Sequence, residues 1–144
     1  AGGRIAIGSD SHISINPFEE LRWLEYGQRL ASQSRNVVSL RDTHVGSELF
    51  LRALEGGAQA AGQSLSGIQV GAPADLVALY ADDPMLAGHD DDSRLDALVF
   101  SGDPRPVERV MVDGSWVVVD AVHVDRDRAR DEFAATLDHI GKRT

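Results

Sequence analysis

The hydrophobic positions in the first part of the chain change from a strand pattern to a helix pattern. A short apolar run at residues 4–8 predicts a buried strand, which ends in the polar cluster at residues 9–12. Asn16 and Pro17 then form a typical helix start, because Asn16 can cap the helix and Pro17 suits its first position. Apolar residues spaced by three and four predict that this helix extends over residues 17–30.

The middle of the chain contains a second helical pattern and then a strand. Residues 46–62 carry apolar side chains at helical spacing, and the pair Gly56 and Gly57 inside this pattern either weakens the helix or allows a close neighbour. After turn residues, the alternating run at 74–80 predicts a strand. Residues 93–100 suggest a short helix.

The last third of the chain predicts a hairpin followed by a helix. Two β-rich runs, 107–112 and 115–119, are joined by Asp113 and Gly114, a dipeptide that favours a type I′ turn. Residues 125–140 are amphipathic and predict a final helix. The chain therefore has a helical first part and a part made mostly of strands, which is an α/β composition.

Composition and charge narrow the functional class. The chain has 144 residues, 42% of them hydrophobic, and its net charge of −9 repels phosphate backbones, so we expect no nucleic-acid partner. It has no cysteine and therefore no disulfide or thiolate metal site. No apolar run approaches the ~20 residues that span a bilayer, and no signal peptide is recognisable, so we expect a cytoplasmic protein without a membrane partner. Because an apolar run begins almost at once and no initiator Met is present, we expect a portion of a longer protein.

Asp10 is the first candidate for chemistry. A carboxylate at the carboxyl end of a strand can bind a metal or carry a proton. The same residue types are also typical of a polar turn, and composition alone favours the turn. Zinc would need further ligands, and the five histidines stand far apart in the sequence.

A second acidic group offers a weaker candidate. His89 is followed by three aspartates at 90–92, which could hold a hard cation. The spacing of a calcium loop is absent, so a solvated loop is the favoured interpretation.

Several stretches together resemble the formimidoylglutamate deiminases of the amidohydrolase superfamily. The specific ones are IGSDSH at 7–12, NP at 16–17 and EELRWLEY at 19–26. More general likenesses to the ending of the superfamily are found at 53–62, at 67–77 and in the hairpin at 113–114. The resemblance covers nearly the whole chain, but only its first part points to one family within the superfamily.

The resemblance implies a fold that this chain forms only in part. Members of the family have a metal-dependent (β/α)8 barrel that carries a small β-sandwich built from both ends of the chain. On this basis residues 1–66 contain the last barrel strand and the helices after it. Residues 67–122 are the returning strands of the β-sandwich, and residues 123–144 form the C-terminal helix. A complete barrel needs ~250 residues, so the chain is expected to be the C-terminal portion of such an enzyme.

The resemblance also implies a chemistry for Asp10. It matches the aspartate that binds the single divalent metal, usually zinc, and that acts as general base and then general acid between the activated water and the leaving ammonia. The reaction implied is hydrolysis of N-formimidoyl-L-glutamate to N-formyl-L-glutamate and ammonia, a step of histidine degradation. Ser11 and His12 are expected beside this site. The remaining metal ligands belong to other parts of the enzyme, so the isolated segment is expected to be inactive.

Two alternatives stay open at this stage. One is another amidohydrolase deaminase, of the guanine or cytosine type, although the stretch at 20–26 favours the first family. The other is a non-catalytic α/β module for binding or assembly. If the first reading holds, we expect the full-length protein to be a homodimer that acts on a small-molecule substrate.

Overall fold

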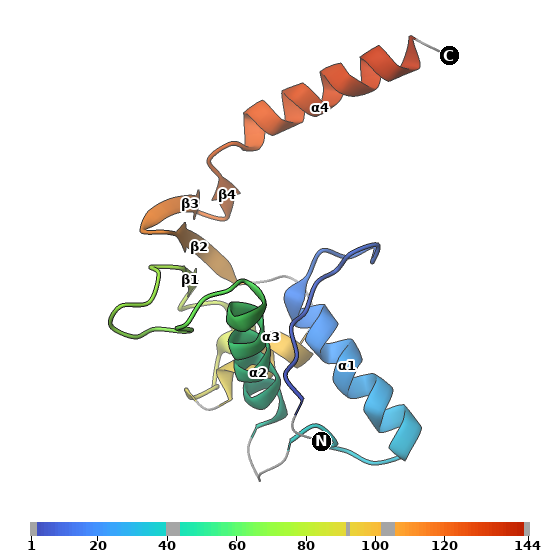
Figure 1. The fold of residues 1–144 in the computed structure, drawn as a ribbon, viewed down its shortest axis with the longest axis vertical. Coiled ribbons are helices and arrows are strands. Elements are labelled where there is room, and N and C mark those ends of the chain that lie inside the picture. The colour runs from blue at the N-terminus through green and yellow to red at the C-terminus, as the bar shows by residue number, and fades with distance from the viewer. Residues whose placement is uncertain (1–2, 40–43, 92, 102–105, 143–144) are drawn as a thin grey trace. The chain divides into compact units, whose positions relative to one another are not determined.

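A computed structural model describes residues 3–39, 44–91, 93–101 and 106–142 of the chain (Figure 1). Contacts between Cα atoms divide the chain into two compact units, one made of residues 1–72 and 81–106 and the other of residues 73–80 and 107–144. The elements in chain order are α1 (Pro17–Ser32), α2 (Val45–Ala60), β1 (Leu76–Leu79), the 3-10 turn η1 (Pro84–Leu86), α3 (Arg94–Phe100), β2 (Val107–Val112), β3 (Ser115–Val119), β4 (Val122–His123) and α4 (Arg126–Gly141).

The first unit has a small core between its helices. Apolar faces of α1, α2 and α3 meet there, as the spacing of hydrophobic residues predicts. Two aromatic contacts support the packing, because the Phe18 and Phe50 rings are 6.3 Å apart and the Tyr26 and Phe100 rings 6.0 Å apart. The fully or nearly buried members of the core are Leu21, Val45, Leu49, Ala53 and Val99.

Local sequence determines where α1 begins. The side chain of Asn16 accepts a hydrogen bond of 3.1 Å from the backbone N–H of Phe18, and Pro17 occupies the first helical position. The helix ends at Ser32, after which Gln33 adopts a left-handed conformation with φ of 53°. The predicted helix over 17–30 is therefore confirmed, with two further residues at its end.

The glycine pair in α2 permits a close approach and does not interrupt the helix. A Cβ atom on Gly56 would overlap the backbone carbonyl of Ile5, whereas one on Gly57 would meet nothing within 4 Å. Gly46 also lies close to α3, since a Cβ there would be 2.7 Å from the Cα of Asp96. Small residues thus bring the backbone of Ile5 and the start of α3 against α2.

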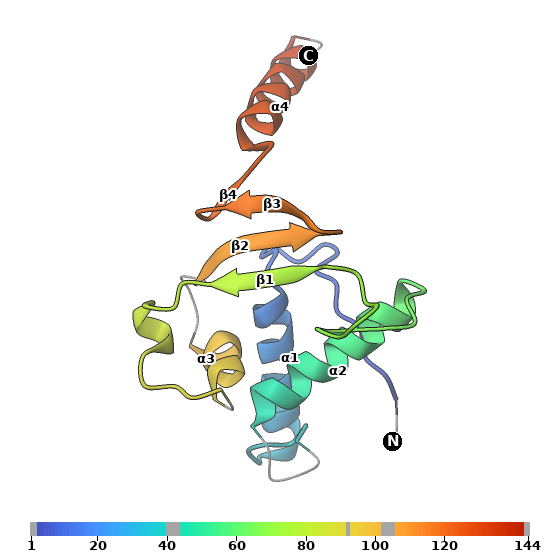
Figure 2. The same ribbon diagram turned by 90° about the vertical axis from the view of Figure 1, so that its left-hand side faces the viewer.

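The second unit contains a four-stranded antiparallel sheet in the order β1-β2-β3-β4, and Figure 2 shows strands β1 to β3 side by side. Asp113 and Gly114 both have positive φ angles, 47° and 76°, as a type I′ turn requires, so the predicted hairpin is confirmed. The short strand β4 was not predicted. It follows Asp120 and Ala121, which also have positive φ, but Asp-Ala is not a dipeptide that signals a hairpin.

The strand predicted at residues 4–8 is not formed. Residues 3–9 have no regular secondary structure, and Ile7 is 36% exposed where a buried position was predicted. A strand is defined by hydrogen bonds to a neighbouring strand, and no strand within the described ranges lies beside this segment. The predicted buried strand is therefore wrong for the described chain, because an apolar pattern does not by itself supply the neighbour on which burial and pairing depend.

The final helix α4 confirms the prediction for residues 125–140 to within one residue. Arg128 forms ion pairs with Asp125 and Glu132 at 3.2 Å along its polar face. The whole helix is exposed, including the apolar residues of its amphipathic pattern, Ala129, Phe133, Leu137 and Ile140. Among the helices of the described ranges, none has the length and apolar character needed to cross a bilayer.

Candidate functional site

The turn that carries Asp10 is closed by its own backbone. The N–H of His12 donates a hydrogen bond of 2.6 Å to the carbonyl of Ser9, and Asp10 adopts a left-handed conformation with φ of 40°. Asp tolerates this region better than most residues because its short polar side chain can bond locally. Asp10 and Ser11 are both exposed. The structure thus places Asp10 in a polar turn, and its carboxylate oxygens remain accessible to a ligand.

His12 connects this turn to the start of α1. Its Nδ1 atom lies 3.2 Å from both the backbone N and the carbonyl O of Ser14, and 3.7 Å from Oε1 of Glu20. Glu20 was not among the residues singled out from the sequence. The signal that could have found it is its position in the first turn of a helix, where acidic residues are favoured by the helix dipole.

Glu19 provides a second link between this segment and α1. A hydrogen bond from the Ser14 side chain is the main cause that lowers the pKa of the Glu19 carboxyl; partial desolvation opposes it. The indole Nε1 of Trp23, 3.4 Å from Oε1 of Glu19, lowers the pKa further. The segment from Ser9 to Ser14 is therefore held by two acidic residues of one helical turn.

The described residues supply one plausible metal ligand at this turn but not a complete site. The carboxylate of Asp10 is a suitable donor for zinc or another divalent cation. In the parts of the chain that the structure describes, however, no group of three or more His, Asp or Glu side chains is assembled to hold a metal ion. A metal bound at Asp10 would need ligands from elsewhere, as the sequence analysis expects.

The acidic loop after His89 is engaged in its own hydrogen bonds. Oδ1 of Asp90 accepts from the hydroxyl of Ser93 at 2.6 Å, which lowers the pKa of the Asp90 carboxyl, and His89 lies 3.2 Å from the same hydroxyl. Asp91 pairs with Arg94 at 2.9 Å, while Asp92 lies outside the described residues. These contacts agree with the solvated-loop interpretation.

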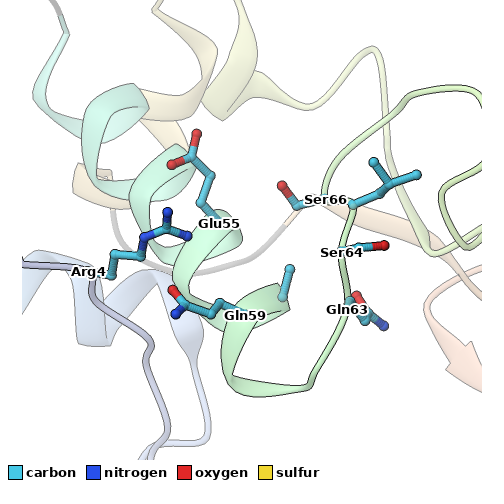
Figure 3. Close-up of a pocket in the computed structure, with 8 residues that line it drawn as sticks. Arg4, Glu55, Gln59, Gln63, Ser64 and Ser66 are labelled. Atoms are coloured by element: carbon cyan, nitrogen blue, oxygen red, sulfur yellow. The ribbon is translucent and has the colours of Figure 1, made fainter.

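A polar pocket of about 420 Å³ lies elsewhere in the first unit. Figure 3 shows Arg4, Glu55 and Gln59 on one side of it, opposite Ser64 and Ser66. None of the predicted site residues lines this pocket. The pocket and the turn that carries Asp10 are therefore separate features of the molecule.

Comparison with known proteins shows what the chain is similar to. No family model matches it. A formimidoylglutamate deiminase from Pseudomonas aeruginosa is 46% identical over 140 residues, which is 96% of this chain and 31% of that protein. The crystal structure of an amidohydrolase from Brucella melitensis shares 38% identity and a TM-score of 0.86, over 96% of this chain and 30% of that one. The chain thus spans about a third of the length of these relatives. It is homologous, over nearly its whole length, to a segment of formimidoylglutamate deiminase, and it has the fold of the matching part of an amidohydrolase.

Proposed function

We propose that this chain is part of a metal-dependent deiminase that hydrolyses N-formimidoyl-L-glutamate to N-formyl-L-glutamate and ammonia. The observation that carries the proposal is the 46% identity with a formimidoylglutamate deiminase across 140 residues. The stretch at 7–12, which contains Asp10, lies within the part of the sequence whose resemblance to this family is specific.

The proposal includes the architecture that such an enzyme requires. Residues 4–10 would be the last strand of a (β/α)8 barrel, followed by α1 and α2, and β1 to β4 would belong to a small β-sandwich. Residues 3–9 form no strand with the described part of this chain, which is compatible with a partner strand from the rest of such an enzyme. The close packing of Ile5 on Gly56 supports this assignment, since it keeps the segment against a helix, as in a βα layer.

Asp10 is the residue of this chain that we assign to the reaction. A divalent ion such as zinc, when bound, supplies Lewis acidity and activates water for attack near neutral pH. Asp10 would hold that ion through its carboxylate together with ligands from the rest of the enzyme. The same carboxylate takes up the proton released as water adds to the formimidoyl carbon. It then returns the proton to the departing nitrogen. The new hydroxyl group loses its own proton to the same nitrogen as the C=O bond of the formyl group forms, so that the C–N bond breaks and ammonia leaves.

The test is Asp10→Asn in the full-length protein that contains this segment, assayed by ammonia release from N-formimidoyl-L-glutamate. Asparagine cannot carry the proton, so we expect kcat to fall by about 10²–10⁴-fold. Asp113→Asn is the matched control, because Asp113 is also an exposed aspartate in a left-handed turn, with φ of 47°, but belongs to the hairpin of the sheet. It should retain full activity.

The outcome also separates the candidate functions. Retention of more than a few percent of kcat by Asp10→Asn would remove Asp10 from the reaction. Wild-type turnover of guanine or cytosine in place of formimidoylglutamate would favour another deaminase. The isolated chain should neither bind zinc tightly nor turn over substrate, because one carboxylate does not make a zinc site.

A further inference from the structure

We infer that Glu20 is a positioning residue of the candidate site, which acts through His12 on the turn that carries Asp10. The inference rests on the proposed function, in that it takes Asp10 as the metal-binding and proton-carrying residue. It assigns a role to a residue that does not itself touch the metal or the substrate.

The first observation is that, in the part of the chain that the structure describes, the buried carboxylate of Glu20 lacks a hydrogen bond at one of its oxygens. The Glu20 side chain is only 23% exposed, and its Oε1 atom is sealed from solvent without a hydrogen-bond partner among the described residues. The nearest cationic or donor group recorded for it is Nδ1 of His12, at 3.7 Å. That distance suits an ion pair but is too long for a hydrogen bond. A buried carboxylate oxygen is costly to leave unpaired, and therefore favours a close contact with the His12 ring.

The second observation is that His12 fixes the turn from two directions. Its backbone N–H closes the turn onto Ser9, and its ring is held between Ser14 and Glu20. Asp10 lies inside this closed turn in a left-handed conformation. Such a conformation persists only where the surroundings determine it. Glu20 belongs to the first turn of α1, so its contact with His12 anchors the turn to a rigid element.

The chemistry of the pair suits this role. Nδ1 of His12 accepts a hydrogen bond of 3.2 Å from the backbone N–H of Ser14 and lies 3.7 Å from Oε1 of Glu20, so the ring is held by the backbone on one side and bordered by the carboxylate on the other. Here the fixed ring is two residues from Asp10, so an error in its orientation is transmitted directly to the turn.

The experiment compares three variants of the full-length protein. Glu20→Gln removes the acidic partner of the pair and His12→Gln removes the imidazole. The second variant should fold normally because the His12 side chain is 40% exposed. Glu48→Gln is the matched control. Glu48 is an acidic residue in the first turn of α2, its side chain is 21% exposed, and it forms an ion pair of 2.6 Å with Arg52. Each variant is measured for zinc affinity, kcat, KM and thermal unfolding midpoint.

We expect Glu20→Gln and His12→Gln each to weaken zinc affinity and to lower kcat by about 10–100-fold. KM should change by no more than about twofold, because the contact does not involve the substrate directly. The double variant should be no worse than the more severe single variant, since both substitutions break one contact. Glu48→Gln should match the wild type in zinc affinity and kcat.

A zinc affinity and a kcat within about twofold of wild type in His12→Gln would overturn the inference, even if Glu20→Gln failed to fold. Multiplied losses in the double variant would overturn it as well, and so would a lowered unfolding midpoint with unchanged zinc affinity. Failure of the proposed function looks different. The wild type would then release no ammonia from N-formimidoyl-L-glutamate, while the zinc affinities would still support or reject the role of Glu20.

Discussion

The close contact between Gly56 and Ile5 allows us to predict whether an alanine at position 56 stabilises or destabilises the protein. A Cβ atom at position 56 would overlap the carbonyl of Ile5, and both the oxygen and the carbon that it would meet are backbone atoms. Backbone cannot move aside as the end of a flexible side chain can. Gly57, one residue further along the same helix, has open space where its Cβ would be.

Alanine at position 56 should therefore destabilise the protein, whereas alanine at position 57 should stabilise it. Replacing glycine by alanine inside a helix stabilises it by about 0.5–1 kcal/mol, and this gain applies at both positions. At position 56, overpacking costs about 1–3 kcal/mol, and contact with backbone favours the upper part of that range. We expect Gly56→Ala to lower the free energy of unfolding by about 1–2 kcal/mol and Gly57→Ala to raise it by about 0.5–1 kcal/mol.

The assay is thermal unfolding of the purified protein, followed by circular dichroism or calorimetry. A loss of about 1–2 kcal/mol corresponds to a fall in midpoint of about 2–8 °C for a domain of 150–250 residues. Since the segment of Ile5 leads directly to Asp10, Gly56→Ala should also lower the deiminase activity that we propose for the full-length protein, whereas Gly57→Ala should not. Equal midpoints and equal activities for the two variants would refute the packing that the structure shows between α2 and this segment.

Two further predictions concern carboxylates of α1. Glu25 is fully buried and accepts hydrogen bonds from Arg29 at 2.7 Å and from the backbone N–H groups of Val37 and Val38 at 3.2 and 3.1 Å. Glu25→Gln should therefore cost about 1–3 kcal/mol in urea unfolding, and a loss below 0.5 kcal/mol, on the order expected for a surface change, would contradict these contacts. For Glu19, whose pKa is lowered chiefly by the Ser14 side chain, the stabilising contribution is present above its unfolded pKa of about 4.3 and is lost as pH falls through the lowered folded value. Ser14→Ala should raise the pKa of Glu19 in an NMR titration, and an unchanged pKa would exclude that hydrogen bond as its cause.

The site was only partly accessible from the sequence. Asp10 was singled out as a candidate because a polar cluster follows an apolar run, and because that stretch resembles a known family. Glu20 was missed, since nothing in the spacing of His12 and Glu20 shows that a turn and a helix will bring them to 3.7 Å from each other. The strand predicted before Asp10 was also not formed. A strand needs a neighbouring strand to pair with, and in the described part of the chain no strand lies beside residues 3–9.

The sequence by itself determined the elements whose signals are local. The cap at Asn16 and the Asp113–Gly114 turn each depend on the conformational preferences of a few adjacent residues, so α1 and the hairpin could be predicted almost to the residue. Only the tertiary structure decided which groups meet across the chain: Gly56 with Ile5, Glu25 with the backbone of Val37 and Glu20 with His12. Such contacts depend on how helices and connecting segments pack in three dimensions. Local preferences define each element, but the burial that brings distant groups together depends on all of them at once.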